Sequence, residues 1–448
     1  MMKAYKHIYI WVVLVAAIFV YGACTPSWID PMTPGNQNNG NPGHRQESLD
    51  TRKVMLLYIA GYNDLQSYLT ANIEDLMKGW IPKNNRSNDV LLVFSHLSKS
   101  GSDSNTPTVP VLTRLYTDYS GKVIADTLVR YSTDAVAASA TQLRNVLTYV
   151  KDNFEAKSYG LIFSSHATGF LPTGYYRKPG SYVYDESSMM FTSGKSRKDY
   201  LTYALYEEEE QDPTRPMVKS IGQSVVNGRS YEIEIDDFAE AIPMKLDYVL
   251  FDACLMGGIE TAYELAGKCD YVAFSQAEVL AQGFNYKTIA RHLLYNNEKS
   301  HPDMVCKDYI DHYNSLTGVY RSATVSLIDC NRLEPLADLC QRLFSKYREG
   351  LDGIAPSKVQ RFYTGNHPWF YDLQSIITVA GADEEEVAEL TDILDECVIY
   401  KGHTPYFLSD FAIKTFSGFS MYLPRNGTTE LNKYYKTLKW NKATGLVE

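Results

Sequence analysis

Short runs of apolar, β-forming residues recur along the chain, and segments with helical spacing separate them. The runs at 53–60, 89–96, 159–165, 246–251 and 270–275 are almost continuously hydrophobic rather than alternating. That pattern is typical of strands buried on both faces of a parallel sheet. Strands of this kind with helices between them predict a doubly wound α/β core.

Other stretches refine this organisation. A helix is expected from about 63 to 79, with Asn63 and Asp64 as candidate caps, and residues 111–129 are expected to form a hairpin around Ser120-Gly121. Further helices are predicted at 135–154, 236–241, 256–266, 333–347, 384–400 and 432–440, and further strands at 323–328 and 416–423. We therefore predict a main domain over 51–300 and a C-terminal α/β region over 301–448 packed on it.

The first residues read as an export signal. Lys3 and Lys6 precede an apolar run at 8–20, and two small residues then lead to Cys24. The run is shorter than the roughly 20 apolar residues that a membrane span needs. We expect residues 1–23 to be a signal peptide.

The position of Cys24 directly after the small residues resembles the lipobox of bacterial lipoproteins, in which the cysteine is lipidated and becomes the N-terminus. Tyr21 departs from that motif, which usually has an aliphatic or small residue there. The resemblance implies anchoring through Cys24 to the outer membrane or cell surface, with an ordinary secreted protein or an uncleaved anchor as alternatives. Residues 24–50 hold Pro, Gly and Asn and read as a flexible tether.

Charge and cysteine usage exclude several classes of protein. The formal charge is -10, so a nucleic-acid partner is not expected, because phosphate backbones are bound by basic faces. The cysteines lack CxxC spacing, and neither an HExxH motif nor a phosphate-binding loop is present. The sequence itself therefore requires no cofactor or metal.

Two residues with reactive side chains follow buried strands. His166 comes directly after the strand at 159–165, and Cys254 comes just after the strand at 246–251. Neighbouring parallel strands would bring these ends to one edge, where ligands of α/β sheets bind. A thiolate nucleophile needs an acid or base partner, and histidine supplies one near neutral pH. The alternative is that Cys254 is a buried packing residue.

The segments SSHATG at 164–169 and DACLMGGIE at 252–260 resemble the clostripain family of cysteine peptidases, relatives of caspases, gingipains and legumains. The resemblance implies a caspase-like fold, a mostly parallel sheet flanked by helices, and cleavage of peptides or proteins after Arg or Lys. Cys254 would be the nucleophile, His166 the general acid, and the backbone N–H groups of Cys254 and Ala167 the oxyanion donors. Ala167 stands where the family usually has Gly, so a positive φ there would strain it.

Three further residues are candidates for substrate binding. Asp252 lies two residues before Cys254, so its carboxylate is expected on the same face as the thiol. The resemblance implies that it lines a pocket for a basic side chain, and the alternative is an acid bonded to backbone N–H groups. Gln276 and Glu278, beyond the strand at 270–275, could form another wall of the pocket or be ordinary loop residues.

Calcium and self-cleavage enter only through the resemblance, because some relatives use both. The acidic run at 207–210 favours a solvated surface over a calcium site. Basic residues between His166 and Cys254 that would permit self-cleavage are Lys178, Lys195, Arg197 and Arg215. The alternative to a peptidase is an exported lipoprotein on the same scaffold that binds peptides or glycans, its catalysis weakened by Ala167.

Overall fold

The computed structural model describes residues 52–84, 89–99, 106–184, 203–204, 216–218, 224–226, 229–295 and 299–448. The expected signal peptide at 1–23, the tether at 24–50 and the acidic run at 207–210 lie outside these residues, as do the possible cleavage positions Lys195, Arg197 and Arg215.

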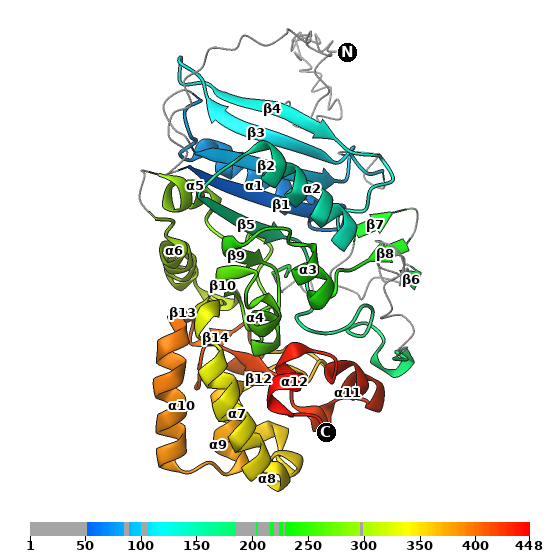
Figure 1. The fold of residues 1–448 in the computed structure, drawn as a ribbon, viewed down its shortest axis with the longest axis vertical. Coiled ribbons are helices and arrows are strands. Elements are labelled where there is room, and N and C mark those ends of the chain that lie inside the picture. The colour runs from blue at the N-terminus through cyan, green and yellow to red at the C-terminus, as the bar shows by residue number, and fades with distance from the viewer. Residues whose placement is uncertain are drawn as a thin grey trace, which may run out of the picture.

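A mixed sheet of nine strands runs through the protein in the order β13-β11-β10-β9-β5-β1-β2-β3-β4 (Figure 1). Its parallel centre consists of β10 (Cys269–Phe274), β9 (Leu246–Asp252), β5 (Ser158–Ser164), β1 (Lys53–Gly61) and β2 (Val90–Leu97). The outer strands pair antiparallel and are β3 (Val111–Thr117), β4 (Val123–Arg130), β11 (Thr324–Asp329) and β13 (Val398–His403). The predicted α/β class and the hairpin are confirmed.

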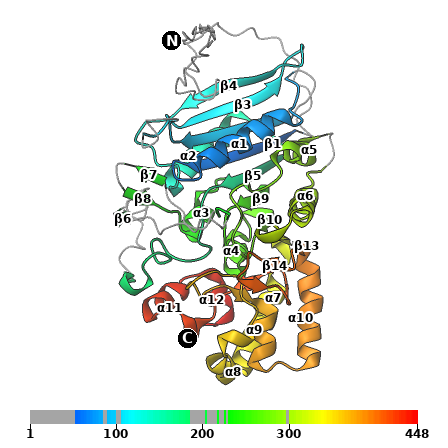
Figure 2. The same ribbon diagram turned by 180° about the vertical axis from the view of Figure 1, so that it is seen from behind.

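The central strands are mostly apolar because helices cover both faces of the sheet. Every residue of β1 and β2 is buried. One face carries α2 (Ala140–Asn153), α3 (Ile235–Ala241) and α4 (Ile259–Leu265), and the other carries α1 (Gln66–Lys78), α5 (Tyr286–Leu294) and α6 (Pro302–Ser315) (Figures 1 and 2). All five parallel strands end at one edge, so the loops that follow them gather there.

The later part of the chain completes this sheet and adds helices beside it. β11 and β13 extend the sheet beyond β10, and small two-stranded pairs form between β12 (Tyr371–Asp372) and β16 (Ser420–Met421) and between β14 (Tyr406–Phe407) and β15 (Phe411–Ala412). The helices are α7 (Glu334–Lys346), α8 (Arg348–Gly353), α9 (Leu373–Ala380), α10 (Glu384–Cys397), α11 (Thr429–Tyr435) and α12 (Lys439–Thr444). The division into domains at residue 300 stays a prediction. Another small sheet contains β6 (Tyr203–Ala204), β7 (Ser224–Val226) and β8 (Arg229–Tyr231).

Several element boundaries differ from the prediction. The helix expected to 400 stops at Cys397 because the chain turns into β13, and the strand expected over 416–423 shrinks to Ser420–Met421. The helix expected over 432–440 is two helices, α11 and α12. Four helices, α5, α6, α8 and α9, were not predicted.

The first helix also begins differently. Leu65 is its N-cap residue and makes no side-chain cap, whereas Asn63 and Asp64 had been the candidates. The Asn63 side chain instead accepts a hydrogen bond from the Leu65 N–H in the preceding turn, at 3.0 Å.

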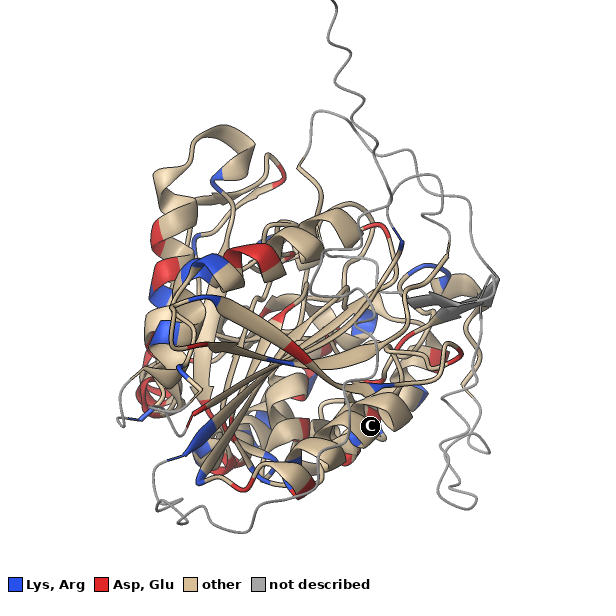
Figure 3. Cartoon of the chain, turned by 90° about the horizontal axis from the view of Figure 1, so that it is seen from above, with Lys and Arg blue, Asp and Glu red and all other residues tan. Residues whose placement is uncertain are grey.

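Charged residues are interspersed over the molecule. In the view from above, basic and acidic positions both occur along the helices (Figure 3). Among the residues placed in the structure, no helix is both long and apolar enough to cross a bilayer.

Candidate active site

The strands that carry His166 and Cys254 are direct neighbours. β5 and β9 pair in parallel, and Ser164 lies opposite Asp252 in their register. His166 and Cys254 each follow this last pair by two residues. The two side chains therefore occupy equivalent positions beyond adjacent strand ends.

The loops that follow the two strands are in backbone contact. Gly169, in the loop after His166, has φ +66°, and a Cβ atom there would lie 2.5 Å from the Leu255 carbonyl oxygen. Only glycine permits both that dihedral angle and that approach. Leu255 itself has φ 60°, an uncommon conformation for a residue with a large side chain. The histidine and cysteine loops thus pack on each other.

Cys254 is fully buried and its sulfur receives a backbone donor. The Val279 N–H donates to Sγ with N and Sγ 2.9 Å apart, and the Val279 carbonyl oxygen is 3.6 Å from Sγ. The Leu255 N–H donates to Ala277 O at 3.0 Å, so the cysteine loop is fixed to the loop after β10. The Val279 backbone thus contacts the sulfur through both its N–H and its carbonyl oxygen.

His166 contacts a carboxylate that the sequence prediction did not include. Its Nε2 lies 2.6 Å from Oδ1 of Asp64, and the imidazole is almost completely buried. Burial acts to raise the pKa of Asp64, but the hydrogen bond and the charge of His166, with Arg177, together lower that pKa below its ordinary value. Asp64 is therefore ionised near neutral pH and faces the imidazole as an anion.

Asp252 is a buried carboxylate at the end of β9, on the side of the sheet that α5 covers. Its Oδ2 accepts hydrogen bonds from Ser164 Oγ at 2.8 Å and from the Tyr286 hydroxyl at 2.6 Å. Burial, and then the charge of Asp252, raise the pKa of Tyr286 well above its ordinary value, so the phenol stays a donor. A Cβ atom on Gly283 would lie 2.2 Å from Asp252 Oδ1. Backbone and hydroxyl groups thus surround this carboxylate closely.

The sequence model of the clostripain family matches residues 57–195 and 205–445, which is most of the chain and includes both strand ends. The chain belongs to the clostripain family. It is accordingly a cysteine peptidase, and its substrate is a peptide. No curated protein gives a significant match to it.

Solved structures show the same fold as the peptidase. An inactive zymogen C11 protease from Parabacteroides distasonis is 24% identical with a TM-score of 0.67, over 89% of this chain and 99% of that one. A secreted C11 cysteine protease from Bacteroides thetaiotaomicron is 23% identical with a TM-score of 0.67, over 88% and 99% of the two chains. A structure of a secreted C11 protease of that organism with an irreversible peptide inhibitor is 20% identical with a TM-score of 0.67, again over 88% and 99%. The caspase-like α/β architecture expected from the resemblance is confirmed.

The backbone of Ala167 is not strained, although a positive φ was considered there because the family usually has Gly at this position. Among the described residues, the non-glycine positions with positive φ are Leu255 and Leu408, so Ala167 has an ordinary negative φ. The positive φ in this loop falls two residues later, at Gly169. The methyl group of Ala167 therefore does not by itself weaken the neighbouring backbone donor. Whether the N–H groups of Ala167 and Cys254 bind the oxyanion stays a prediction.

Gln276 and Glu278 both make internal contacts. Gln276 is fully buried, and its Nε2 donates to Gly418 O at 2.8 Å and to Ser326 Oγ at 3.0 Å. Glu278 is also buried, and its Oε1 accepts from Thr364 Oγ1 at 3.1 Å. These bonds connect the loop after β10 to the C-terminal region. A role of either side chain in substrate binding stays a prediction.

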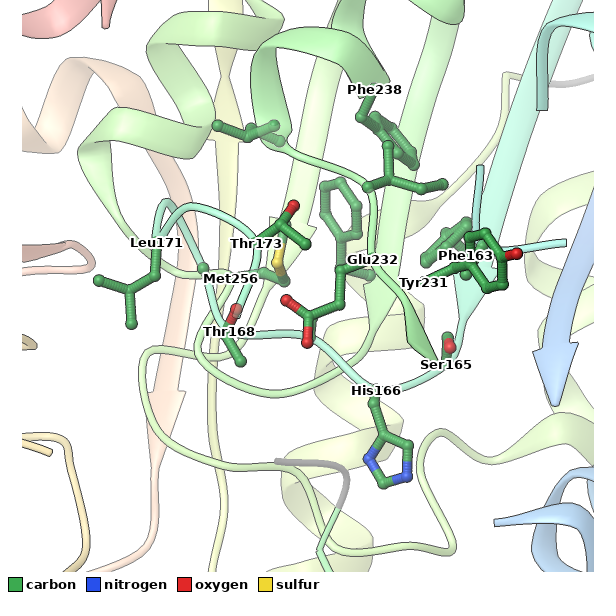
Figure 4. Close-up of a pocket in the computed structure, with 16 residues that line it drawn as sticks. Phe163, Ser165, His166, Thr168, Leu171, Thr173, Tyr231, Glu232, Phe238 and Met256 are labelled. Atoms are coloured by element: carbon green, nitrogen blue, oxygen red, sulfur yellow. The ribbon is translucent and has the colours of Figure 1, made fainter. Parts of the chain in front are cut away.

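A pocket opens beside the histidine loop, on the α2 and α3 side of the sheet (Figure 4). Residues 165–169 form one wall, and Met256, from the cysteine loop, and Glu232 also line it. Burial raises the pKa of Glu232 to about 7, although the Gly174 N–H and Arg177 act to lower it. The other walls are mainly apolar and include Phe163, Phe238, Phe251, Ile233 and Ile235. Asp252 lies on the opposite face of the sheet, so this pocket is separate from it.

Sequence reasoning missed Asp64, Val279 and Tyr286. Asp64 had the same signal as His166, a polar residue just beyond a buried strand, but its position suggested a helix cap. Val279 acts through its backbone, and Tyr286 lies on an unpredicted helix, so no side-chain motif could have identified either. Within the described ranges, no group of three His, Cys, Asp or Glu residues is arranged to hold a metal ion.

Proposed function

We propose that the peptidase is an endopeptidase that cleaves after Arg or Lys, with Cys254 as nucleophile and His166 as general acid. The observation that carries this proposal is the parallel register of β5 and β9, together with the contact between Gly169 and Leu255. These features support a thiol and an imidazole at one sheet edge. A dyad is recognised by such mutual geometry rather than by spacing in sequence.

The chemistry follows from the two groups. The Cys254 thiolate attacks the scissile carbonyl carbon, and the new C–S bond leaves negative charge on the oxygen. His166 gives its proton to the leaving amine as the C–N bond breaks, which produces a thioester. His166 then takes a proton from a water molecule that attacks the thioester, the C–S bond breaks, and the acid product leaves, which restores the thiolate and the imidazolium. Backbone N–H groups of Ala167 and Cys254 stabilise the oxyanion, and each lowers the barrier by about 2.7 to 4 kcal/mol.

Asp252 supplies the preference for a basic residue before the scissile bond. Asp252 ends β9 on the side of the sheet opposite Phe251 and the pocket of Figure 4, two residues before Cys254. A carboxylate gives charge-assisted hydrogen bonds to guanidinium or ammonium groups. The Tyr286 hydroxyl at 2.6 Å and the Ser164 hydroxyl at 2.8 Å hold this carboxylate in place. Gln276 and Glu278 support the same site from the loop after β10.

The backbone beyond Val279 supports binding of an extended peptide. Val218 forms an antiparallel bridge with Leu280, and the Ala281 N–H donates to Met217 O at 2.9 Å. Residues 217 and 218 of the chain itself are thus paired with the backbone next to Val279, whose N–H contacts Sγ of Cys254. We infer that the main chain of a substrate takes the place of residues 217 and 218 on this edge, because β-strand addition binds backbone groups regardless of side chain.

Hydrolysis of Arg- and Lys-ended reporter peptides tests the function. We expect the wild-type chain to release the reporter under reducing conditions and Cys254→Ala to lose all activity. Cys340→Ala is the matched control, because it truncates another buried cysteine on α7. Assays with added calcium and with a chelator decide whether calcium is needed. If the wild type hydrolyses no reporter with calcium or with the chelator, the result would contradict the proposed activity and favour the alternative, a scaffold that binds peptides or glycans.

The pattern of the N-terminal residues supports export of the peptidase. We propose that residues 1–23 are removed and that a lipid on Cys24 anchors the peptidase to the outer membrane or cell surface. This proposal rests on the resemblance of the residues before Cys24 to a lipobox. The secreted Bacteroides thetaiotaomicron protease supports export. The mass of the mature N-terminal peptide tests this, and an unmodified Cys24 would contradict lipidation.

A further inference from the structure

The turn after β1 holds Asp64 in a fixed position. Asn63 Nδ2 donates to Ala60 O at 3.1 Å, and Asn63 Oδ1 accepts from the Leu65 N–H at 3.0 Å. Asp64 lies between these bonds, and α1 begins directly after them. The Asn63 side chain therefore fixes the backbone both before and after Asp64.

This turn brings a third strand end to the catalytic edge. β1 pairs in parallel with β5, and Ile59 lies opposite Ser164. The chain beyond β1 therefore leaves the sheet beside the loop that carries His166. Asp64 Oδ1 lies 2.6 Å from His166 Nε2, and the imidazole is 3% exposed while the carboxylate is 45% exposed.

The contact selects one arrangement of the imidazole. A carboxylate acceptor at Nε2 requires a proton on that nitrogen, so Nδ1 is the nitrogen that exchanges the catalytic proton. The anion also stabilises the positive charge that the ring carries before it protonates the leaving amine. Among the described residues, the charged groups that act on Asp64 are His166 and Arg177.

We propose that Asp64 is a positioning residue of the peptidase, which orients the His166 ring and stabilises its protonated form. The inference rests on the proposed Cys254–His166 dyad and adds a third member to it. Asp64 touches neither substrate nor sulfur in this account and acts only through the imidazole.

Substitution of Asp64 tests the role through kinetics. In Asp64→Asn we expect kcat to fall by about 10- to 100-fold, less than the 10²- to 10⁴-fold that a general acid supplies, with KM changed by less than about twofold. The alkaline limit of kcat/KM should move to lower pH, because the amide no longer stabilises the imidazolium. Asp64→Glu should recover part of the rate, since it restores the carboxylate.

Asp75→Asn is the matched control. Asp75 lies on α1 and forms an exposed ion pair with Lys78 at 2.9 Å, so the control removes a carboxylate from the same helix region. We expect its kinetics and pH profile to equal those of the wild type. A purely structural role for Asp64 would lower the melting temperature and leave the pH profile in place, and that result would overturn the proposal.

Alkylation of Cys254 by iodoacetamide gives a readout that needs no turnover. The thiolate that pairs with the imidazolium reacts faster at neutral pH than a free thiol does. In Asp64→Asn, peptide mass mapping should show labelling of Cys254 slowed by about tenfold at pH 6.5, the effect of one unit in pKa. If reporters fail even with the wild type, the proposed function fails but this comparison still decides the role of Asp64. Equal labelling rates in the two proteins would refute it.

Discussion

The carboxylate of Asp252 gives the sharpest test of substrate preference, and Asp252→Asn is the perturbation. The amide keeps the shape of the side chain and one acceptor oxygen for Ser164 and Tyr286, which both donate to Oδ2. The charge that would bind a guanidinium is lost. The substitution therefore separates recognition of the substrate from support of the fold.

The expected magnitude comes from the kind of bond removed. A hydrogen bond to a charged group contributes about 1.5 to 3 kcal/mol. At about 1.4 kcal/mol per tenfold change, kcat/KM for an Arg reporter should fall by roughly 10- to 150-fold. A citrulline reporter has the same shape without the charge, so its kcat/KM should change by less than about threefold.

The assay is the ratio of kcat/KM for the Arg reporter to that for the citrulline reporter. We expect a large ratio for the wild type and a ratio near one for Asp252→Asn. Asp247→Asn is the matched control on the same strand, because Asp247 also accepts a serine hydroxyl, Ser158 Oγ, at 2.9 Å. An unchanged ratio in Asp252→Asn, with its melting temperature equal to that of the control, would refute the assignment of the basic pocket.

Two further predictions concern buried groups. Burial raises the pKa of Glu260 to about 7, although Tyr435 and Tyr422 donate to it, so the folded protein binds more protons than the unfolded chain between about pH 4.5 and 7. The free energy of unfolding should therefore fall by up to about 3 kcal/mol as pH rises through that window. Urea titrations of Glu260→Gln, which cannot ionise, should show a free energy of unfolding that depends less on pH. The same pH dependence in the variant and the wild type would contradict this. Gly283→Ala should lower both the melting temperature and the Arg-to-citrulline ratio, because its Cβ would meet Asp252 Oδ1 at 2.2 Å. Gly318→Ala, with a similar φ of +61° and open space around it, measures the strain alone, and equal losses in the two variants would contradict the role of the contact.

The central strands could be predicted because their burial on both faces leaves a continuous apolar run in the sequence. β1 and β5 are such runs, and the residue type that follows each one was visible without the fold. Cys254 and His166 were therefore identified from strand ends, and the register of β5 with β9 agrees with that placement.

Contacts that depend on the backbone or on strand order could not be predicted. The sequence does not show that β1 lies next to β5, and without that neighbour Asp64 reads only as a helix cap. The donor to Sγ is the N–H of Val279, an apolar residue. The position of the positive φ, at Gly169 rather than Ala167, likewise required the path of the loop.

The outer and C-terminal elements were predicted less well for a different reason. β16 is formed by Ser420–Met421 alone, although the surrounding sequence has the composition of a longer strand. The Ser417 N–H donates to Oδ2 of the buried Asp372 at 2.7 Å. A side chain thus takes the place of a strand partner there. The composition of a segment indicates that it is buried, but it does not indicate which group accepts the hydrogen bond of each backbone N–H.

The most direct test of the account is a crystal structure of the peptidase after inactivation with an arginyl chloromethyl ketone. We expect a thioether on Cys254 with the His166 ring within hydrogen-bond reach of the bound carbonyl or of the sulfur. A structure in which the inhibitor is attached to another residue, or in which the ring lies on a different edge of the sheet from the modified sulfur, would contradict the Cys254–His166 dyad.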